Sequence, residues 1–528
     1  MRHTIFVICA AVVLTASHAR LQSPSSAVRQ TAYIKASNAE ASDHFGDGGS
    51  LPGHIGNAVA LSGDGNTMAV GAPHESGGTR GINGNQSDNS LYSAGAVYVF
   101  TRRGGGWAQQ AYIKPSNVGR SDNFGINVAL SGDGNTLAVA APWESSSATG
   151  INGNQDDNSI PQAGAVYVFT RSGDRWSQQA YIKASNTGRK AGPGEEIGDG
   201  DQFGFSLALS ADGDTLAAGA ISEDSATGAL YPMTDDSQSS AGAVYVFTRT
   251  GTTWAQQALV KGVNTEGNDL FGYGVALSAD GNAMAVAGYD EDGSGKGVNP
   301  PSDNGLVGTG AIYAFSRTGR IWSQTGYFKG SRSQRNDALG YVVAMSGDGT
   351  TIAAGTADES CLVPGINPTG CDVDTYPPDL AAGSAGAVYV WVRNGSSWTE
   401  QAFIKASNPD LEDWFGVRLA LNGNGNTLAV VAPMEDSVAR GINGSQADDS
   451  ATDSGAAYLF SRTGTTWVQR AYLKGSNTEA FDEFGSSVAV SRDGRTVAIG
   501  ARIEASAGGA NQGNNDAPES GAVYVFSN

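Results

Sequence analysis

The sequence predicts an all-β fold, a seven-bladed β-propeller with four antiparallel strands in each blade. Three observations predict it. One phrase recurs seven times along the 528 residues. Each copy holds four short strand patterns, separated by turn residues such as Asp-Gly. The chain also begins with a spare strand and ends one strand short, so its two ends can complete a single blade.

The composition agrees with a fold of strands and tight turns. Gly contributes 74 residues, and only 16% of the residues are charged. Val, Thr, Tyr, Asn and Asp are common, and no long segment has helical periodicity. The formal net charge of −20 argues against nucleic acid and anionic lipid as partners. It suits cations, basic proteins or neutral glycans, although solubility alone would also explain it.

The N-terminus has the features of a signal peptide. An apolar run over residues 4–14 follows Arg2 and is too short to span a bilayer. Small residues ending at Ala19 predict a signal peptide over 1–19, with cleavage after Ala19, and then a spacer over 20–29. We therefore expect a secreted, extracellular or periplasmic protein. A disordered tail is the alternative. No later segment is apolar enough to span a membrane.

The repeat is registered by a small residue before the aromatic residue or Leu of its outer strand. These markers recur at intervals of 68 to 79 residues: Ala32, Ala111, Ala180, Ala258, Gly326, Ala402 and Ala471. The interval is too long for a solenoid repeat and suits a four-stranded blade with long loops.

The second copy illustrates the order of the elements. Strand A is expected over 125–130, and an Asp-Gly turn leads to strand B over 136–141. A long loop then reaches strand C over 164–170. A second turn leads to Trp176 and strand D, which ends at Lys183.

The two ends of the chain predict how the ring closes. A lone D-type strand covers about residues 30–35, six complete sets follow, and the chain stops on a C strand at 523–526. Adding the first strand to the last blade completes seven blades and protects edges that would otherwise be unpaired. The propeller is therefore expected to span 30–528.

The repeat also carries a family resemblance. Phe124-Gly125, followed by Ala140-Ala141-Pro142, resembles the FG-GAP repeat of the integrin α-subunit head, and the resemblance covers about 30–528. It implies a propeller that binds partners, often in adhesion. The calcium sites of that family lie in A–B loops, but the corresponding segments here, such as 62–66, are too short and are interpreted as turns.

Strand direction predicts which face is functional. The A–B and C–D turns are short, and the long D–A and B–C connections share the other face, where binding residues are expected.

A Glu follows strand B in each copy: Glu75, Glu144, Glu223, Glu291, Glu359, Glu435 and Glu504. A Lys ends strand D in each copy: Lys35, Lys114, Lys183, Lys261, Lys329, Lys405 and Lys474. An Asp precedes the Phe-Gly position in most copies: Asp122, Asp201, Asp269, Asp337, Asp413 and Asp482. In the first copy Phe45-Gly46 and Ile55-Gly56 both fit that position, and Asp43 is the corresponding Asp if Phe45-Gly46 takes it.

Two interpretations of these charged residues remain open. Sevenfold recurrence favours inter-strand ion pairs that hold each blade together. The alternative is a calcium site that combines Asp122 and Glu144 with Asp156 and Asp157 of the B–C loop.

The tryptophans divide into two groups. Those that begin the outer strands are expected to pack: Trp107, Trp176, Trp254, Trp322, Trp398 and Trp467. Trp143 and Trp414 each occur once at their repeat position on the loop-rich face. These two are the candidates for a ligand contact.

The remaining polar candidates lie in single copies. Cys361 and Cys371 are expected to form a disulfide that closes one loop. His44, His54 and His74 crowd into the first blade near Asp43, Asp47 and Glu75, which suggests either a small metal site or clustering by insertion. No catalytic motif is present.

These features favour a non-enzymatic, monomeric binding or adhesion module for an extracellular protein or glycan, with calcium as the only cofactor considered. One alternative is a hydrolase or lyase with a blade-specific acidic site near the central channel. The other is a structural envelope protein.

Overall fold

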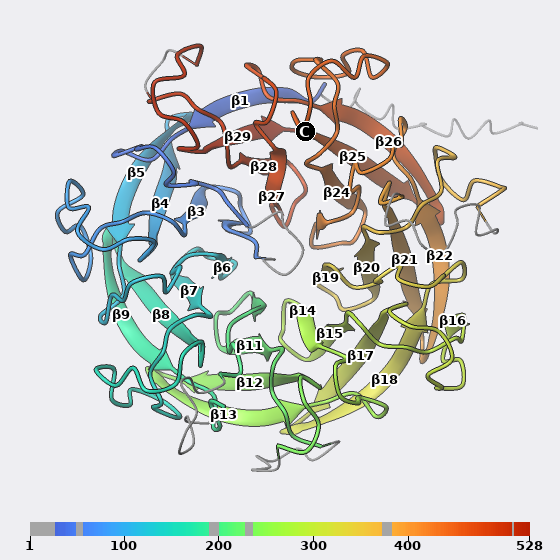
Figure 1. The fold of residues 1–528 in the computed structure, drawn as a ribbon, viewed down its shortest axis with the longest axis horizontal. Helices are drawn as coiled ribbons and strands as arrows, with labels where there is room; N and C mark the ends of the chain where they lie inside the picture. Colours follow the sequence, from blue (N-terminus) through green and yellow to red (C-terminus); the bar gives the residue numbers. More distant parts are fainter. Residues whose placement is uncertain (1–26, 49–55, 189–199, 227–235, 372–382, 509–511) are drawn as a thin grey trace, which may run out of the picture.

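Seven β-sheets surround a central axis in the computed structural model (Figure 1). It describes residues 27–48, 56–188, 200–226, 236–371, 383–508 and 512–528. The expected signal peptide (1–19) lies outside the described residues, as does the expected spacer except for its last three residues. Within the described ranges, no helix is long or apolar enough to cross a membrane.

Six blades are continuous in the sequence. Blade 1 contains β2 (Val59–Leu61), β3 (Thr67–Ala72), β4 (Ala96–Arg103) and β5 (Gly106–Ile113). Blade 2 contains β6 (Asn127–Leu130), β7 (Thr136–Ala141), β8 (Ala165–Ser172) and β9 (Arg175–Ile182). Blade 3 contains β10 (Leu207–Leu209), β11 (Thr215–Ala220), β12 (Ala243–Thr250) and β13 (Thr253–Val260).

Blades 4 to 6 repeat this order from the axis outward. Blade 4 contains β14 (Phe271–Leu277), β15 (Ala283–Gly288), β17 (Ala311–Thr318), β18 (Ile321–Lys329) and β16 (Gly297–Val298). Blade 5 contains β19 (Val343–Met345), β20 (Thr351–Thr356), β21 (Ala387–Asn394) and β22 (Ser397–Ile404). Blade 6 contains β23 (Arg418–Leu421), β24 (Thr427–Ala432), β25 (Ala456–Thr463) and β26 (Thr466–Leu473).

Blade 7 joins the two ends of the chain, which confirms the predicted closure. It consists of β27 (Phe484–Val490), β28 (Thr496–Ala501), β29 (Ala522–Ser527) and, outermost, β1 (Arg29–Ile34). The two end strands are antiparallel, with Arg29 opposite Ser527 and Ile34 opposite Val523. Figure 1 shows blue β1 lying along red β29.

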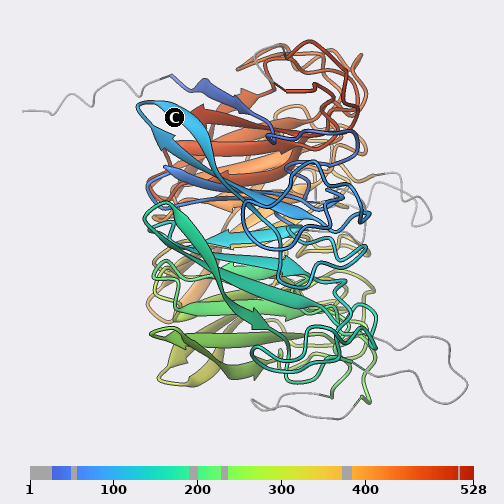
Figure 2. The ribbon, with the colours of Figure 1, turned by 90° about the vertical axis from the view of Figure 1, so that its left-hand side faces the viewer.

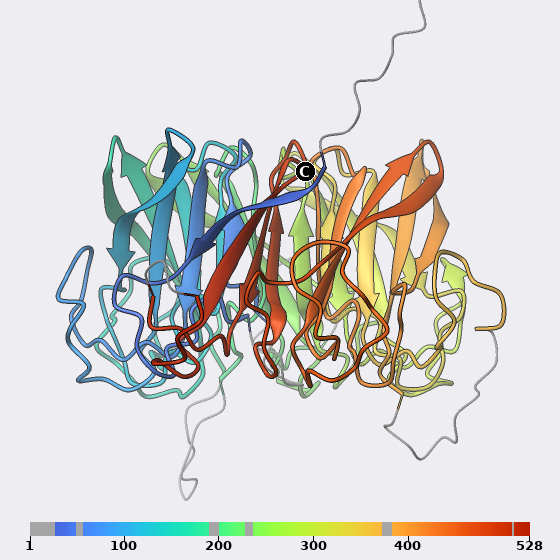
Figure 3. The same cartoon turned by 90° about the horizontal axis from the view of Figure 1, so that it is seen from above.

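The long connections gather on one face of the ring and the short turns on the other (Figures 2 and 3). We call them the loop face and the turn face. The loop face carries the B–C and D–A connections, and the turn face carries the A–B and C–D turns. The start of each inner strand and the end of each second strand meet at the loop face.

The inner strand of blade 2 begins later than the sequence pattern suggested. β6 begins at Asn127, whereas the pattern placed its start at residue 125. Gly125 lies before the strand and has a φ of 101°, a left-handed conformation that favours glycine. Gly125 of blade 2 also lies very close to Gly71 of blade 1. A Cβ on Gly71 would lie 1.9 Å from the Gly125 carbonyl oxygen.

The first copy contains an insertion in its inner strand. Phe45 packs edge-on against Tyr98 and Phe100, as Phe124 does against its own blade. Phe45-Gly46 therefore takes the Phe-Gly position, and the alternative at Ile55-Gly56 does not. The ten extra residues lie between Asp47 and Ala58, and 49–55 lie outside the described part.

The B–C loops fold back onto the outer strands, an arrangement that the sequence patterns did not predict. In blade 1 the Asn83 amide donates to the Tyr112 carbonyl (2.7 Å), and the Asn83 side chain accepts from the Tyr112 amide (3.0 Å). Blades 2, 5 and 6 form the same bridge, and in blade 4 it lengthens into β16. These loops protect the outer edges of the sheets.

A closed circuit of backbone hydrogen bonds joins the A–B turns on the turn face. Each turn donates one N–H to the carbonyl of the next turn in the ring, with N···O distances of 2.8 to 3.1 Å. The residues are Gly63, Gly132, Ala211, Ala279, Gly347, Gly423 and Arg492, which donates back to Gly63. All seven blades are thus tied directly to their neighbours.

The tryptophans of the outer strands also tie blades together. Trp176 donates its indole N–H to Gln110 of the preceding blade (2.9 Å), and Arg171 lies over its ring. The same contacts recur at Trp254, Trp322 and Trp467. They support the packing role inferred for these residues.

Candidate functional site

The recurrent Glu and Lys residues form one buried ion pair in each blade. Lys114 Nζ lies 2.7 Å from Glu75 Oε2, and both side chains are almost fully buried. The pairs are Glu75–Lys114, Glu144–Lys183, Glu223–Lys261, Glu291–Lys329, Glu359–Lys405, Glu435–Lys474 and Glu504–Lys35. In each pair the Glu follows the second strand and the Lys ends the outer strand. The residues therefore serve the framework of the blade.

The recurrent Asp residues are buried next to these pairs. Asp413 accepts a hydrogen bond from the Asp410 amide (2.9 Å), and equivalent bonds form at Asp43, Asp269, Asp337 and Asp482. Burial raises the pKa of Asp413 to about 8; the charge of Glu435 adds to the effect, which outweighs the amide bond. Burial likewise raises the pKa to about 7 at Asp43, Asp122, Asp269 and Asp482.

The four residues of the expected calcium site do not form one group in the structure. Glu144 accepts from Asn117 (2.9 Å), Tyr181 (3.0 Å) and Lys183 (2.7 Å), so both of its oxygens have partners. Asp157 accepts from the Ser147 hydroxyl and the Ser159 amide. Asp156 is exposed, and Asp122 belongs to the buried ring described above. These contacts support the structural interpretation, and calcium binding here stays a prediction.

A second ring of seven residues varies from blade to blade on a constant backbone. The residue between the recurrent Asp and the Phe position has a left-handed φ of 50 to 58° in every copy. The residues are His44, Asn123, Gln202, Leu270, Ala338, Trp414 and Glu483. Asn and His adopt this conformation more often than most residues that have a side chain, so the fold imposes it on the other five. We call these residues the variable ring; it lies at the inner edge of the loop face.

The two predicted ligand-contact tryptophans lie near this edge. Trp414 belongs to the variable ring, and its amide donates to the Ser384 carbonyl (2.9 Å). Trp143 directly precedes Glu144, after the second strand of blade 2. Both side chains are partly exposed. Their role in ligand binding stays a prediction.

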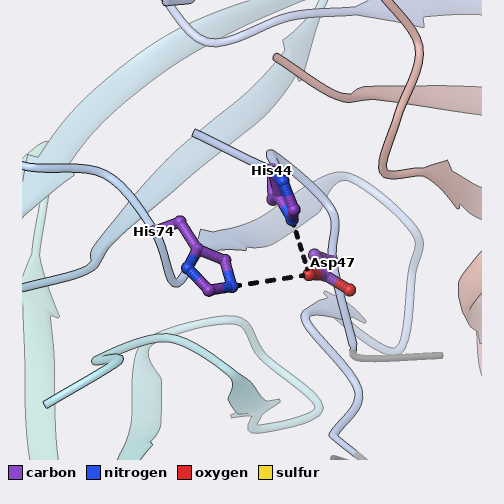
Figure 4. A group of neighbouring side chains, drawn as sticks. All are labelled: His44, Asp47 and His74. Carbon is purple, nitrogen blue, oxygen red and sulfur yellow. Dashed lines mark hydrogen bonds and ion pairs between the residues drawn. The ribbon is translucent and has the colours of Figure 1, made fainter. Parts of the chain in front are cut away.

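Among the described residues, histidines and a carboxylate come together only in blade 1. Asp47 Oδ2 lies 3.1 Å from His44 Nδ1 and 4.0 Å from His74 Nε2 (Figure 4). Of the expected neighbours, Asp43 and Glu75 belong to the repeated framework, and His54 lies outside the described residues. We call His44, Asp47 and His74 the histidine cluster.

The histidine cluster is electrostatically coupled. Burial lowers the pKa of His44, but the hydrogen bond to Asp47 and the charge of Asp47 outweigh this effect and raise it overall. Burial alone would raise the pKa of Asp47. The hydrogen bond from His44 and the charge of Arg502 instead hold it well below its usual range. Asp47 is therefore a carboxylate near neutral pH.

Tyrosines occupy the opposite part of the channel mouth. The rings of Tyr273 and Tyr289 stack at 4.3 Å. Tyr289 donates to Tyr341 (3.2 Å), whose hydroxyl donates to Asp358 (2.8 Å). Tyr273 is a buried residue of β14 in blade 4, and Tyr341 is a buried residue two positions before β19 in blade 5. Together these residues form a polar and aromatic lining in blades 4 and 5.

The inserted segment of blade 1 is anchored by a residue of blade 6. Arg418, at the start of β23 in blade 6, donates to the carbonyls of Gly48 and Gly56, both at 2.7 Å. Blade 7 stands between these two blades. Arg418 is buried, and burial lowers its pKa to about 10. It therefore fixes both described ends of the insertion over the inner strands.

A disulfide closes one B–C loop on the same face. Cys361 and Cys371 are joined, with a Cα–Cα distance of 5.4 Å. Both residues are buried against blade 5.

Comparison with known proteins gives a family for the repeat. The FG-GAP repeat family matches residues 107–169 and 467–526. No curated protein matches the sequence. The likeness to the integrin α-subunit head stays a prediction.

Solved structures with a similar arrangement are distant in sequence. One is a candidate 6-phosphogluconolactonase from Bacteroides uniformis, with a TM-score of 0.42 and 10% identity over 81% of this chain and 88% of that chain. Another is hydrazine synthase from Kuenenia stuttgartiensis, with a TM-score of 0.43 and 12% identity over 85% and 96%. A third is a protein from Lactobacillus plantarum, with a TM-score of 0.43 and 11% identity over 80% and 84%. Likeness at this level carries no argument about function. The chain is a seven-bladed β-propeller, and the two family matches support FG-GAP repeats as its building unit.

Proposed function

We propose that this propeller is a secreted or surface-exposed binding or adhesion module that recognises an extracellular protein or glycan through its loop face. The observation that carries the proposal is the variable ring. Seven different side chains stand on one repeated backbone position, while the adjacent Asp, Glu and Lys residues are the same in every blade. A position that changes within a constant framework is suited to recognition.

The chemistry of the loop face supports this proposal. Trp414 and Trp143 offer partly exposed aromatic surfaces, which suit a sugar ring or an apolar side chain. The net charge of −20 favours neutral glycans or basic protein surfaces over anionic partners. We propose that the chain acts as a monomer.

A binding screen with face-specific variants tests the proposal. The full chain is applied to a glycan array and to a panel of extracellular matrix proteins. Trp143→Ala and Trp414→Ala are expected to weaken any binding that is found by about tenfold each. The matched control is Ile321→Ala, which removes an exposed apolar side chain from the turn face. Equal weakening by the control would contradict the assignment of the loop face. Absence of any binding would favour a structural envelope role.

A calcium requirement is tested separately by thermal unfolding. If calcium binds at Asp122 and Glu144, added calcium raises the melting temperature of EDTA-treated protein, and Asp122→Asn removes the effect. An unchanged melting temperature would contradict the calcium hypothesis.

A hydrolase or lyase is the second candidate. It is favoured by the blade-specific polar residues at the channel mouth, namely the histidine cluster and the Tyr341–Asp358 pair. A screen of ester, glycoside and lactone substrates tests it. Loss of the activity in Tyr341→Phe, with stability unchanged, would support the enzyme.

A further inference from the structure

We propose that His44, Asp47 and His74 form a binding site for one first-row transition-metal ion of the Zn²⁺ class. Among the described residues they are the one group of three or more His, Cys, Asp or Glu residues whose ligand atoms converge, all within 4.8 Å of one another. Two imidazoles and one carboxylate are a donor set for zinc, cobalt, nickel or iron. The proposal does not depend on the proposed binding function.

The distances are close to those of a metal-bound set. Zinc–nitrogen bonds of about 2.0–2.1 Å place tetrahedral ligand atoms about 3.3 Å apart. His44 Nδ1 and Asp47 Oδ2 already lie 3.1 Å apart. His74 Nε2 lies 4.0 Å from the same oxygen, and the three ligand atoms lie within 4.8 Å of one another. His74, whose side chain is 35% exposed, must therefore move closer to complete a tetrahedral set. A metal ion would replace the proton shared by His44 and Asp47.

The ring nitrogens that would not bind the ion already have partners. His44 Nε2 faces Glu519 Oε2 at 3.4 Å, and His74 Nδ1 faces Ser93 Oγ at 3.2 Å. Metal-bound histidines commonly donate their second N–H to a carboxylate or another oxygen, which fixes the tautomer and the ring orientation. These contacts hold the two rings in orientations that leave His44 Nδ1 and His74 Nε2 facing Asp47.

The repeat provides an internal comparison. The amide of Asp47 donates to the carbonyl of the variable-ring residue three positions earlier. The same hydrogen bond places Asp47 at the repeat position of Ile126, Phe205, Tyr273, Val417 and Ser486. His74 stands at the position of Trp143, Ser222, Asp290, Asp358, Met434 and Ile503, directly before the recurrent Glu. In blade 1 alone the three positions hold His, Asp and His. A site that serves the fold would recur, and this one does not.

The surrounding charges permit a cation. Arg502 Nη1 lies 4.0 Å from Asp47 Oδ2 and opposes a metal ion. However, Arg502 forms two hydrogen bonds to Glu483, at 2.6 and 2.7 Å, which offset its charge. Glu519 adds a further negative charge. The partial exposure of His74 leaves a route for the ion and for a fourth ligand from solvent. Calcium, which prefers six to eight oxygen ligands, does not suit this set.

Cobalt binding to the full chain tests the site directly. EDTA-treated protein without a histidine tag is titrated with Co²⁺ and followed by its visible d–d absorption. Zn²⁺ is then added in competition. We expect one site, displacement of Co²⁺ by Zn²⁺ and no displacement by Ca²⁺. Absence of a saturable d–d signal, or its displacement by Ca²⁺, would overturn the proposal.

Variants borrowed from other blades show whether these residues are the ligands. His44→Asn, Asp47→Ser and His74→Ser introduce residues that blades 2, 7 and 3 carry at the same positions, so each is compatible with the fold. Each is expected to weaken Co²⁺ binding by more than about 100-fold, and Glu519→Gln by about tenfold.

Two control variants complete the test. Asp290→Asn changes the blade 4 counterpart of His74 and should leave Co²⁺ binding unchanged. Far-UV circular dichroism and thermal melting verify that every variant is folded. Loss of binding in His54→Ala combined with intact binding in His74→Ser would overturn the assignment.

Discussion

The buried ion pair between the two ends of the chain provides the sharpest test of how the ring closes. Lys35 follows β1, and Glu504 follows β28, yet Lys35 Nζ lies 2.9 Å from Glu504 Oε2 and 2.7 Å from Ser520 Oγ. The side chains of the pair are only 5% and 2% exposed. Lys35→Met leaves Glu504 buried and without its cation.

The expected cost follows from these contacts. Removing one partner of a buried pair costs about 3–5 kcal/mol, because an uncompensated charge remains. Glu504 keeps neutral donors from Asn477 (2.9 Å) and Ser506 (3.2 Å), so the lower value of about 3 kcal/mol is expected. The double variant Lys35→Met/Glu504→Gln removes the charge as well and should recover most of the loss.

Hydrogen exchange is the suitable assay, because β1 can separate while the other blades stay folded. A loss of about 3 kcal/mol corresponds to about 100-fold faster exchange of the β29 amides that face β1. The control is Arg103→Ala, which breaks the exposed Arg103–Asp174 pair and should cost less than about 1 kcal/mol. If Lys35→Met accelerates exchange in β29 no more than Arg103→Ala does in its own blade, the reasoning about closure is refuted.

Three further predictions concern the repeated framework. Burial and the charge of Glu435 raise the pKa of Asp413 to about 8, so Asp413 keeps its proton in the folded protein at a pH where the unfolded chain has released it. The stability that this proton contributes is full below about pH 4 and is lost as the pH rises to about 8. Urea unfolding at pH 5 and pH 8 should therefore show a smaller pH difference for Asp413→Asn than for the wild type, and an equal difference would contradict this pKa. Trp176→Phe removes the bond to Gln110 and should lower the unfolding free energy by about 1 kcal/mol, whereas Trp398→Phe, whose indole N–H has no hydrogen-bond partner among the described residues, should cost less. Gly71→Ala places a methyl group against the Gly125 carbonyl and should lower the melting temperature strongly, with a cost of about 3 kcal/mol. The control Gly106→Ala, whose added methyl group would have its nearest neighbour 4.0 Å away, should be neutral. Similar effects of the two variants would argue against close packing of blades 1 and 2 at Gly71.

Local signals in the sequence were sufficient for the fold. The Asp-Gly turns and the seven register markers predicted four strands in each blade, and the unequal ends predicted the shared last blade. The structure adds two features that these signals do not carry. The pairing of B–C loops with the outer strands depends on tertiary contacts, such as those of Asn83 with Tyr112. The circuit on the turn face depends on how neighbouring blades are spaced.

The candidate site was only partly predictable. The sequence placed three histidines in the first blade but could not choose among Asp43, Asp47 and Glu75 as their partner. Glu75 is committed to Lys114 and Tyr112, and Asp43 to the Glu40 amide. Asp47 is the remaining carboxylate. The sequence could not place it beside the histidines, because an insertion begins directly after it and a repeat pattern does not show the register of the chain across an insertion. The sequence shows that the residue between the recurrent Asp and the Phe differs from copy to copy. It does not show that this residue has a left-handed backbone conformation.

The pairing of β1 with β29 also has a mechanical consequence. Arg29 lies opposite Ser527, so the segments leading into β1 and out of β29 leave the sheet at the same end. Force applied between these two segments would load the backbone bonds one after another, as in unzipping, and would peel the blade open at low tension. Force applied between either segment alone and the loop face would be spread over the other interfaces, including the turn-face circuit. We therefore expect the propeller to resist force applied through one end of the chain better than force applied between its two ends.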